Sequence, residues 1–599
     1  MKQFLRRHRE KNAPPELSPP SRVLRRLLSY VTHYRGEMAI VVVLLLIGTA
    51  LNLLVPYLLG EGLNSLSTGF DAALLRNLVL AMVIASLVSW LALLLKGEVL
   101  ASVTQRSLYV LRRQVFEHMQ TLSLNFFDRQ PIGELMSRVT DDSEVIAQFF
   151  RNGLGMLLSE SIKILFIILA MFLLNWRMAI AACVIVPLVL GFLTMVSRIS
   201  GPAFDALQAE VGNLNGIMEE TVSGERVVIA YQRQEEAIAN FEAVSKAAMG
   251  MGIRAQFVAL LSRPITLVLT NLDVALVALV GGLLTLRGEA DIGTVTAFLQ
   301  YTRQFGLPIT NIANTLNFLL AAIASAERVF QILDETPVVR DRPDAIPMPP
   351  IEGKVEFRNV DFSYVPGRRV LKNNSFEVLP GQTIGLCGPT GAGKSTIINL
   401  ITRYYDLDAG EVLIDDHNLL EVQQASLRHQ IGIVLQEPFL FSETVMNNLR
   451  YARLEATEAE CIEAAKRANA HDFVMRLPNG YDTMMTERGS NLSQGQRQLL
   501  TIARMMVANP RMVILDEATS NVDTRTEAKI QEALDRLMAG RTSFVIAHRL
   551  STIRHADKIL VLNAGELVEQ GTHKELLQHK GLYYDLYTSQ FKGKVAALV

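Results

Sequence analysis

The sequence has few of the residues that mark disulfide-rich, metal-binding or nucleic-acid-binding proteins. Only three cysteines occur in 599 residues, and the wide spacing of Cys183, Cys387 and Cys461 matches no metal or disulfide framework. The formal net charge of −1 leaves no domain-wide basic excess. We therefore expect buried or half-buried thiols in a reducing compartment, and no nucleic acid as the main partner.

A secretory signal is also missing from the N-terminus. Residues 1–28 are basic and contain prolines, without a short apolar core followed by a small-residue cleavage site. The pattern predicts a flexible lead-in followed by a basic amphipathic segment. That segment fits either the cytoplasmic membrane surface or a solvated tail.

Hydrophobic residues are abundant, at 50% of the chain, but they are unevenly distributed. About the first 330 residues hold long apolar runs, whereas the remainder has the pattern of a soluble α/β enzyme. The length indicates several domains. We predict an N-terminal segment over 1–36, a membrane domain over 37–332, a proline-rich linker over 333–350 and a nucleotide-binding domain over 351–599.

Six apolar runs approach the length of about 20 residues that crosses a bilayer. The loop between the third and fourth runs is expected to be the tight turn 175–177. The N-terminal segment and the two long connections are rich in Arg, so the positive-inside rule places them and both termini in the cytoplasm. The long connections are predicted to be helices that continue out of the membrane. The six runs are 38–59, 77–95, 157–174, 178–197, 264–286 and 293–318.

Charged residues inside these runs are candidates for the transport pathway. Asp273 and Arg303 lie at similar depth, roughly 18–20 Å below the outer surface at ~1.5 Å rise per residue. Because buried charges in a bilayer are costly, the two are expected either to pair or to line a polar central pathway. Glu160 and Lys163 have the spacing of an interfacial helix pair.

A complete phosphate-binding loop follows the apolar run TIGLC, which reads as a strand, and precedes a predicted helix. In this pattern the glycines let backbone N–H groups surround the phosphates, the lysine reaches the β- and γ-phosphates, and the serine hydroxyl binds Mg²⁺. The sequence therefore predicts an ATP site. Its loop residues are Gly388, Pro389, Thr390, Gly391, Ala392, Gly393, Lys394, Ser395 and Thr396.

Two further strands supply candidate catalytic residues. The run MVILD ends at Asp516, which is placed to hold Mg²⁺, and the next residue, Glu517, is placed to orient an attacking water. The run TSFVIA leads to His548, whose imidazole is a candidate contact of the γ-phosphate. A second anion-seeking loop, NLSQGQ at 491–496, runs into another predicted helix, whose first turn leaves backbone N–H groups available.

With these motifs in this order, the chain resembles an ATP-binding cassette (ABC) exporter half-transporter over almost its whole length. The resemblance implies six transmembrane helices fused to an α/β P-loop ATPase, with ATP and Mg²⁺ bound. It makes the second loop the family signature, whose usual third residue is glycine. The signature would grip ATP held by the other subunit of a dimer, and it consists of Leu492, Ser493, Gln494, Gly495 and Gln496.

The resemblance also assigns roles to residues that carry no signal alone. Tyr364 matches the aromatic residue that stacks on adenine, and Gln436 matches the glutamine that links the Mg²⁺ site to the membrane domain. Residues 486–489 resemble the loop before the signature, and residues 520–523, ending at Asp523, resemble the loop that crosses to the opposite site. Segments 126–142 and 219–235 are similar to the two coupling regions.

A partner chain and a cargo follow from the same resemblance. The unusual Gln494 leaves open whether the dimer is homomeric or heteromeric, but this chain keeps its own catalytic motifs. The expected activity is ATP-driven efflux of drugs or lipids from the cytoplasmic membrane. A lipid flippase and a peptide exporter half are alternatives. An ATP-gated membrane regulator or channel fits less well, because a switch has no need of Glu517.

Overall fold

The structure is a computed structural model that describes residues 19–68, 71–516, 523–546 and 553–596. The residues separate into two compact units. The first unit is helical and falls within Met1–Gln120 and Ile132–Glu335. The second holds two sheets and falls within Thr121–Pro131 and Thr336–Val599. The short segment Thr121–Pro131 therefore belongs structurally with the sheets, although the chain around it belongs with the helices.

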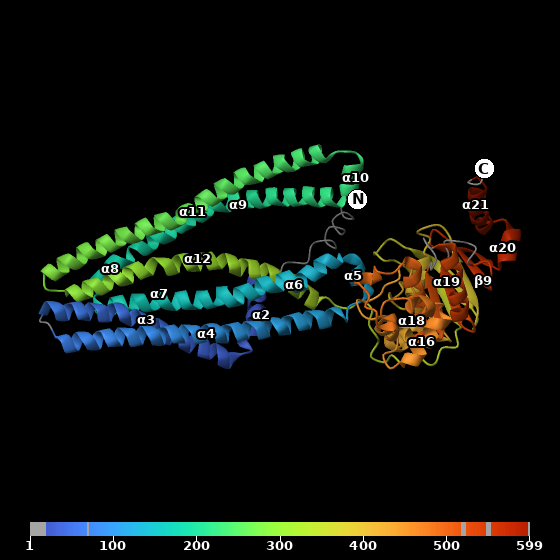
Figure 1. The fold of residues 1–599 in the computed structure, drawn as a ribbon, viewed down its shortest axis with the longest axis horizontal. Helices are drawn as coiled ribbons and strands as arrows, with labels where there is room; N and C mark the ends of the chain where they lie inside the picture. Colours follow the sequence, from blue (N-terminus) through green and yellow to red (C-terminus); the bar gives the residue numbers. More distant parts are fainter. Residues whose placement is uncertain (1–18, 69–70, 517–522, 547–552, 597–599) are drawn as a thin grey trace. The chain divides into compact units, whose positions relative to one another are not determined.

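The helical unit is built from long helices that run along one another (Figure 1). Within the described residues, six helices are long and apolar enough to cross a membrane, as predicted. The long connections are helical, as expected. The elements are α2 (Pro20–Thr32), α3 (Arg35–Thr68), α4 (Ala72–Met119), α6 (Ile132–Gln148), the π-helical η1 (Phe149–Leu154), α7 (Gly155–Leu174), α8 (Trp176–Cys183), α9 (Ile185–Ser223), α10 (Glu225–Ala230), α11 (Gln234–Leu286) and α12 (Ile292–Asp334).

The predicted turn over 175–177 is shorter than expected. Only Asn175 interrupts the helices, and α8 begins at Trp176. The Asn175 side chain explains this, because its Oδ1 accepts from the backbone N–H groups of Arg177 and Met178. An Asn cap satisfies N–H groups that would otherwise need a longer polar loop.

Residues 20–32 of the predicted N-terminal segment form a helix that packs on its own unit, and this part of the segment is not a solvated tail. Helix α2 buries Val23, Leu27 and Val31 against its own unit. Arg26 lies 4.3 Å above the ring of Phe330 and donates to both carboxylate oxygens of Asp334 at 2.7 and 2.8 Å. The basic face thus anchors α2 to the end of α12.

The charged residues inside the helices do not form the ion pairs considered from the sequence among the described residues. Glu160 accepts from Asn311 Nδ2 at 2.9 Å, across to α12, and the structure gives no Glu160–Lys163 ion pair among the described residues. Asp273 and Arg303 lie at the same level of α11 and α12, but the described residues give no ion pair between them. Asp273 is buried, whereas Arg303, the residue after the buried Thr302, is exposed.

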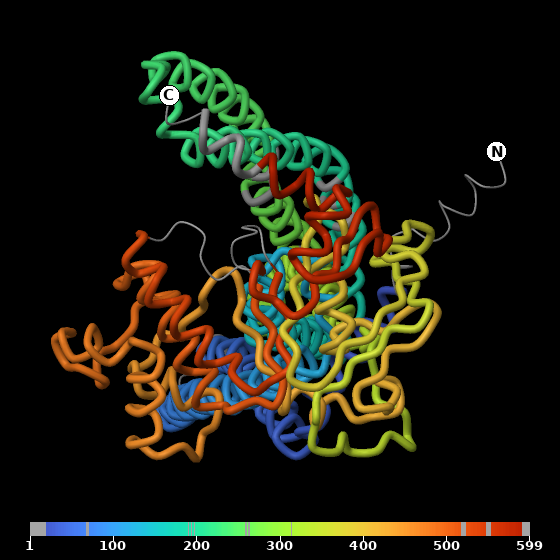
Figure 2. Tube along the Cα trace, turned by 90° about the vertical axis from the view of Figure 1, so that its right-hand side faces the viewer, coloured from blue at the N-terminus to red at the C-terminus, as the bar shows by residue number. Residues whose placement is uncertain are grey.

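Helices α9, α10 and α11 form a hairpin whose α10 end diverges from the other helices of this unit (Figure 1). Figure 2 shows the same divergence from a second direction. No residue of α10 is buried. The hairpin tip carries exposed apolar side chains, at Val222, Val227, Ile229 and Tyr231.

The second unit contains an antiparallel four-stranded sheet, β2-β1-β4-β5, and a six-stranded sheet, β10-β9-β3-β8-β7-β6. Strands β9, β3, β8, β7 and β6 are parallel, so their carboxyl ends share one edge. The strands are β1 (Val355–Phe362), β2 (Leu371–Val378), β3 (Thr383–Cys387), β4 (Ala409–Ile414), β5 (His417–Asn418), β6 (Ile431–Val434), β7 (Met512–Asp516), β8 (Thr542–Ile546), β9 (Lys558–Asn563) and β10 (Glu566–Gly571).

Two hydrophobic clusters hold this unit together, one between the sheets and one among the helices beside the six-stranded sheet. Met348, in the predicted linker over 333–350, and Ile351, directly after it, pack into the cluster between the sheets. The helices are α5 (Leu124–Arg129), α13 (Lys394–Ile401), α14 (Gln424–Arg428), α15 (Val445–Arg450), α16 (Glu458–Arg467), α17 (His471–Val474), α18 (Gln494–Ala508), α19 (Thr524–Met538), α20 (His573–His579) and α21 (Leu582–Ala596), with 3₁₀ turns at Leu419–Glu421, Gly480–Asp482 and Glu487–Gly489.

Candidate functional site

The predicted phosphate loop connects β3 to α13, as its sequence pattern indicates. Gly388 has φ of +146° and Gly393 has φ of +104°, conformations that favour glycine. A Cβ atom on Gly388 would overlap the carbonyl oxygen of Leu562. Lys394 Nζ donates to the carbonyl oxygens of Gly388 and Pro389 at 2.9 and 3.1 Å, so its ammonium is already held inside the loop.

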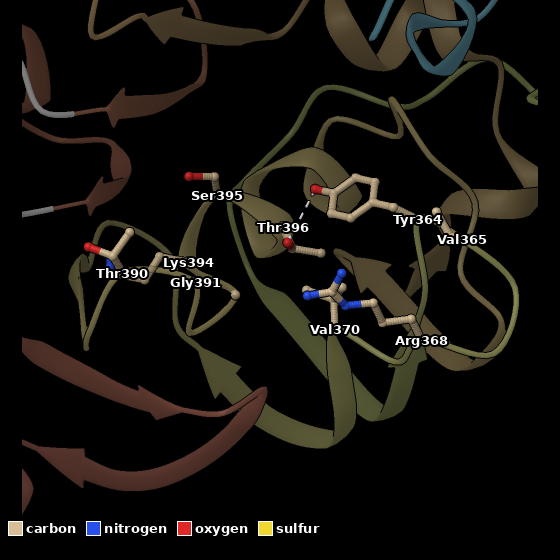
Figure 3. A pocket seen from close by; sticks show the side chains of 10 residues that line it. Tyr364, Val365, Arg368, Val370, Thr390, Gly391, Lys394, Ser395 and Thr396 are labelled. Carbon is tan, nitrogen blue, oxygen red and sulfur yellow. Dashed lines mark hydrogen bonds between the residues drawn. The ribbon is translucent and has the colours of Figure 1, made fainter. Parts of the chain in front are cut away.

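A pocket of about 480 Å³ lies beside this loop (Figure 3). Tyr364 forms one wall and is fixed by two polar contacts. Its hydroxyl donates to Thr396 Oγ1 at 3.2 Å and accepts from Asn399 Nδ2 at 2.9 Å. An aromatic ring next to phosphate-binding N–H groups suits a nucleotide. The lining residues are Tyr364, Val365, Arg368, Val370, Thr390, Gly391, Gly393, Lys394, Ser395 and Thr396.

The carboxyl ends of the parallel strands place two further candidates near the loop. Asp516 is level with Ile546 of β8, and Ile546 is level with Leu386 of β3. At ~4.8 Å between neighbouring strands, Asp516 ends its strand about 10 Å from the strand that leads into the phosphate loop. Gln436 follows β6, the next strand beyond β7. Ligands of α/β sheets bind at this edge.

The oxygen donors at this edge fit Mg²⁺. No group of three or more His, Cys, Asp or Glu side chains in the described ranges could hold a metal ion by itself. Mg²⁺ in nucleotide sites typically takes one or two protein ligands and completes its shell with phosphates and water. The Ser395 hydroxyl and the Asp516 carboxylate provide hard donors of that kind, with the Gln436 amide as a third candidate.

The thiol closest in sequence to this loop is inert. Cys387 ends β3 and is buried, and burial raises the pKa of its thiol to about 12. All three cysteines are free, and Cys387 and Cys461 are buried while Cys183 is half-buried. The expectation of buried or half-buried thiols is confirmed, and the reducing compartment stays a prediction.

The signature loop enters a helix, as its sequence predicts. Ser493 caps α18, because its Oγ accepts from the N–H of Gln496 at 3.3 Å, while the Gln496 side chain accepts from the N–H of Ser493 at 2.9 Å. Gly495 is buried and Gln494 is half-buried. None of these residues lines the pocket beside the phosphate loop. Their role towards the ATP of another subunit stays a prediction.

Three of the remaining candidates follow strands β7 and β8 in the chain. Asp523 caps α19 by accepting from the N–H of Thr526 at 3.0 Å, and this hydrogen bond lowers the pKa of the Asp523 carboxyl. Glu517 and His548 lie outside the described residues, as do residues 520–522 of the predicted crossing loop.

Sequence reasoning missed three side chains that complete the site. Arg368 lines the pocket four residues after Tyr364, and Asn399 holds the Tyr364 hydroxyl from α13. Tyr405 donates to the carboxylate of Asp128 in α5. The available signal for Arg368 was a basic residue in the loop after Tyr364, the tyrosine predicted to stack on adenine. The other two pairs are separated by 35 and 277 residues, and no local pattern joins them.

The helix α5 sits directly against the nucleotide pocket. Besides the Tyr405–Asp128 bond, Arg129 Nη2 donates to the backbone oxygen of Tyr364 at 3.3 Å. The backbone N–H of Val338 donates to Ser123 Oγ at 3.3 Å. A displacement of Tyr364 would therefore also move or strain the contacts of α5 with this pocket wall.

Comparisons with known proteins agree with this site and fold. The family described as "ABC transporter transmembrane region" matches residues 38–309, and the family "ABC transporter" matches residues 371–520. The ABC transporter ATP-binding protein YfiC of Bacillus subtilis (strain 168) is 41% identical over 569 residues, which cover 95% of this chain and 94% of that protein.

Two other relatives have names that include a cargo. The ATP-dependent lipid A-core flippase of Syntrophus aciditrophicus (strain SB) is 37% identical over 95% of both chains. The fatty acid ABC transporter ATP-binding/permease protein of Mycobacterium tuberculosis (strain CDC 1551 / Oshkosh) is 40% identical over 86% of this chain and 81% of its own. A structure of a bacterial Atm1-family ABC exporter with ATP bound superposes with a TM-score of 0.76 at 29% identity, covering 93% of this chain and 98% of that one.

Proposed function

Because the chain belongs to the ABC transporter family, as an exporter half whose membrane helices are fused to an ATPase domain, we propose that it exports hydrophobic or amphiphilic molecules, drugs or lipids, across the cell membrane. One observation carries the proposal: a phosphate loop and Tyr364 line one pocket in a chain that also supplies six apolar helices. The relatives named as a lipid A-core flippase and a fatty acid transporter support a cargo with a long apolar part.

The nucleotide is held by this chain's own residues. Tyr364 stacks on adenine, and the loop N–H groups together with Lys394 bind the β- and γ-phosphates. Ser395, Asp516 and Gln436 would hold Mg²⁺, which would supply positive charge to neutralise the phosphates. Glu517 orients the attacking water and His548 contacts the γ-phosphate, as the resemblance implies.

Hydrolysis requires a second half-transporter chain. Ser493, Gln494, Gly495 and Gln496 of one subunit complete the ATP site of the other, and the loop ending at Asp523 crosses between them. The exposed apolar tip of the α9–α10–α11 hairpin supports a partner, since Val222, Val227, Ile229 and Tyr231 have no cover within the described residues. The second chain is a copy of this one or a related half.

The chain is a multi-pass membrane protein, and we propose that both termini and the ATPase domain are cytoplasmic. The Arg-rich N-terminal segment and long connections support this orientation. Membrane lipids therefore surround the helices, and cargo enters from the cytoplasm or the inner leaflet. A flippase that moves a lipid between leaflets is the second candidate, favoured by the relative named as a lipid A-core flippase.

The test is the ATPase activity of the chain, purified alone in lipid nanodiscs, beside Glu517→Gln. Turnover that the substitution abolishes establishes a functional homodimer, and candidate drugs, fatty acids and lipids are then ranked by stimulation. A sample that binds ATP without turnover indicates a missing partner chain, to be sought by co-purification. Ion conductance without nucleotide-driven accumulation of any cargo would contradict export and favour an ATP-gated channel.

A further inference from the structure

Asp273 is an acidic group packed inside the membrane helices. It lies in α11 with 4% of its surface exposed, and its Oδ1 has no hydrogen-bond partner among the described residues. The apolar cluster around this part of α11 includes Met178, Val277, Phe298 and Phe305. An ionised carboxylate without a partner is very unfavourable in such surroundings, and the usual outcome is that the group becomes neutral.

A second buried polar atom without a partner lies on the neighbouring helix, α12. Thr302 of α12 is 1% exposed, and its Oγ1 also has no partner. A threonine hydroxyl inside a helix usually bonds the carbonyl four residues earlier. Thr302 lacks this hydrogen bond. Other threonines of the same helices donate to the carbonyl oxygen four residues earlier, namely Thr270, Thr285, Thr296, Thr310 and Thr315.

The register of the two helices brings these atoms to one level. A Cβ on Gly306 would lie 2.7 Å from Thr270 Oγ1, and a Cβ on Gly281 would lie 3.0 Å from Val295. Since α11 and α12 are antiparallel, these two contacts set Asp273 opposite residues 302–303. Asp273 therefore lies between two places where the helices touch, and the Thr270–Gly306 contact is about one helical turn away.

Among the described side chains, the elements packed against α11 provide no counter-ion for Asp273. On α12, Arg303 points outward and the hydroxyl of Tyr301 donates to the carbonyl oxygen of Leu53 at 2.8 Å. On α8, Cys183 is close enough to interact electrostatically with Asp273, but its thiol brings no positive charge. On α9, the contact of Gly252 with Leu207 sets the register, so Arg198 lies roughly 18 Å further along the helix.

We propose that Asp273 is a proton-binding site in the membrane bundle, protonated while α11 and α12 are closed and facing the hydroxyl of Thr302. Separation of the helices at Thr270 and Gly306 admits water and the proton leaves. The transport cycle then takes up and releases one proton per chain at this carboxyl. The release and uptake of the proton during transport rest on the proposed function, because ATP-driven motion separates the helices. The protonation of Asp273 in the closed bundle does not rest on it.

Carbodiimide labelling tests the protonated acid directly. N,N′-Dicyclohexylcarbodiimide is apolar and reacts with protonated carboxylic acids, and the modified residue is located by mass spectrometry. Glu160 is the matched control, because it lies in the same bundle but has Asn311 as a hydrogen-bond donor and Lys96 nearby. In nanodiscs without nucleotide, we expect label on Asp273 at least tenfold above Glu160. An unlabelled Asp273, or equal labelling of both, overturns the site.

Trapping the ATP-bound state tests the cycle. In Glu517→Gln with ATP, labelling of Asp273 should fall at least fivefold, because the carboxyl meets water and ionises. Undiminished labelling overturns proton release while leaving the buried acid in place. As a second readout, the ratio of ATPase rates at pH 6 and pH 8 should change at least threefold in Asp273→Asn and stay constant in Asp291→Asn. If the chain has no ATPase activity alone, the nucleotide-free labelling still decides whether the acid is protonated.

Discussion

The hydrogen bond between Tyr405 and Asp128 should hold α5 against the ATPase unit. Tyr405→Phe removes the hydroxyl that donates to the Asp128 carboxylate and leaves the shape of the ring almost unchanged. A hydrogen bond to a charged group contributes roughly 1.5–3 kcal/mol. Because Asp128 is exposed and can recover water, the lower end applies, which is about tenfold in the docked-to-undocked equilibrium.

The burial of the Tyr405 ring keeps its hydroxyl protonated and able to donate this hydrogen bond. Burial, followed by the Asp128 carboxylate, raises the pKa of Tyr405 far above its ordinary value, so the hydroxyl stays a donor throughout the physiological range. The contact should therefore survive a rise in pH above neutrality.

Hydrogen-exchange mass spectrometry of residues 121–131 measures the docking directly. Tyr405→Phe should accelerate exchange of this segment about tenfold. Tyr404→Phe is the matched control, since the neighbouring ring lies 5.0 Å from Arg428 but its hydroxyl has no hydrogen bond in the described residues. Equal exchange in Tyr405→Phe and wild type, or the same acceleration in both variants, would refute the reasoning.

Three further outcomes follow from the ATPase unit. Gly388→Ala should abolish ATP binding because its Cβ meets a backbone carbonyl, whereas Gly391→Ala, with open space and φ of +81°, should weaken it by roughly tenfold or less in a fluorescent-nucleotide titration; equal losses would contradict this. Arg403 is 2% exposed and binds two carboxylates and two carbonyl oxygens. Arg403→Met should therefore destabilise the unit by about 3–5 kcal/mol and lower its Tm well below that of Arg358→Met, which removes an exposed ion pair. Similar Tm values for the two variants would disprove a structural role of Arg403. Burial, followed by nearby positive groups, lowers the pKa of His573 in the folded state. The unfolded state therefore binds the proton more readily, and the stability should fall as the pH drops below about 6.5. His573→Gln should flatten this dependence of Tm on pH, and an unchanged slope would exclude His573 as its source.

The sequence predicts the architecture well where periodicity or a motif is local. The apolar runs correspond to the six candidate spans, and the strands before Gly388 and through Asp516 are where their apolar patterns place them. The capping of α18 by Ser493 also follows from its own residues. In each case the information lies within a few turns or one strand of the chain.

The contacts between distant segments could not be read from the sequence. Arg403 is a buried cation that fastens residues 340 and 341 to the sheet region, and nothing around it in sequence distinguishes it from a surface arginine. Asp273 and Arg303 have complementary charges at equal depth, but adjacent helical positions differ by about 100° in direction. Thr302 therefore faces α11, and Arg303 does not.

Transport by the reconstituted chain tests the account most directly. Proteoliposomes with the ATPase domain outside receive ATP and Mg²⁺, and uptake of a fluorescent fatty acid and a fluorescent lipid is followed over time. The account predicts uptake or leaflet transfer of at least one amphiphile that requires ATP and disappears in Glu517→Gln and Lys394→Ala. Robust ATP hydrolysis with no movement of any amphiphile, or movement that persists in both variants, would contradict ATP-driven export.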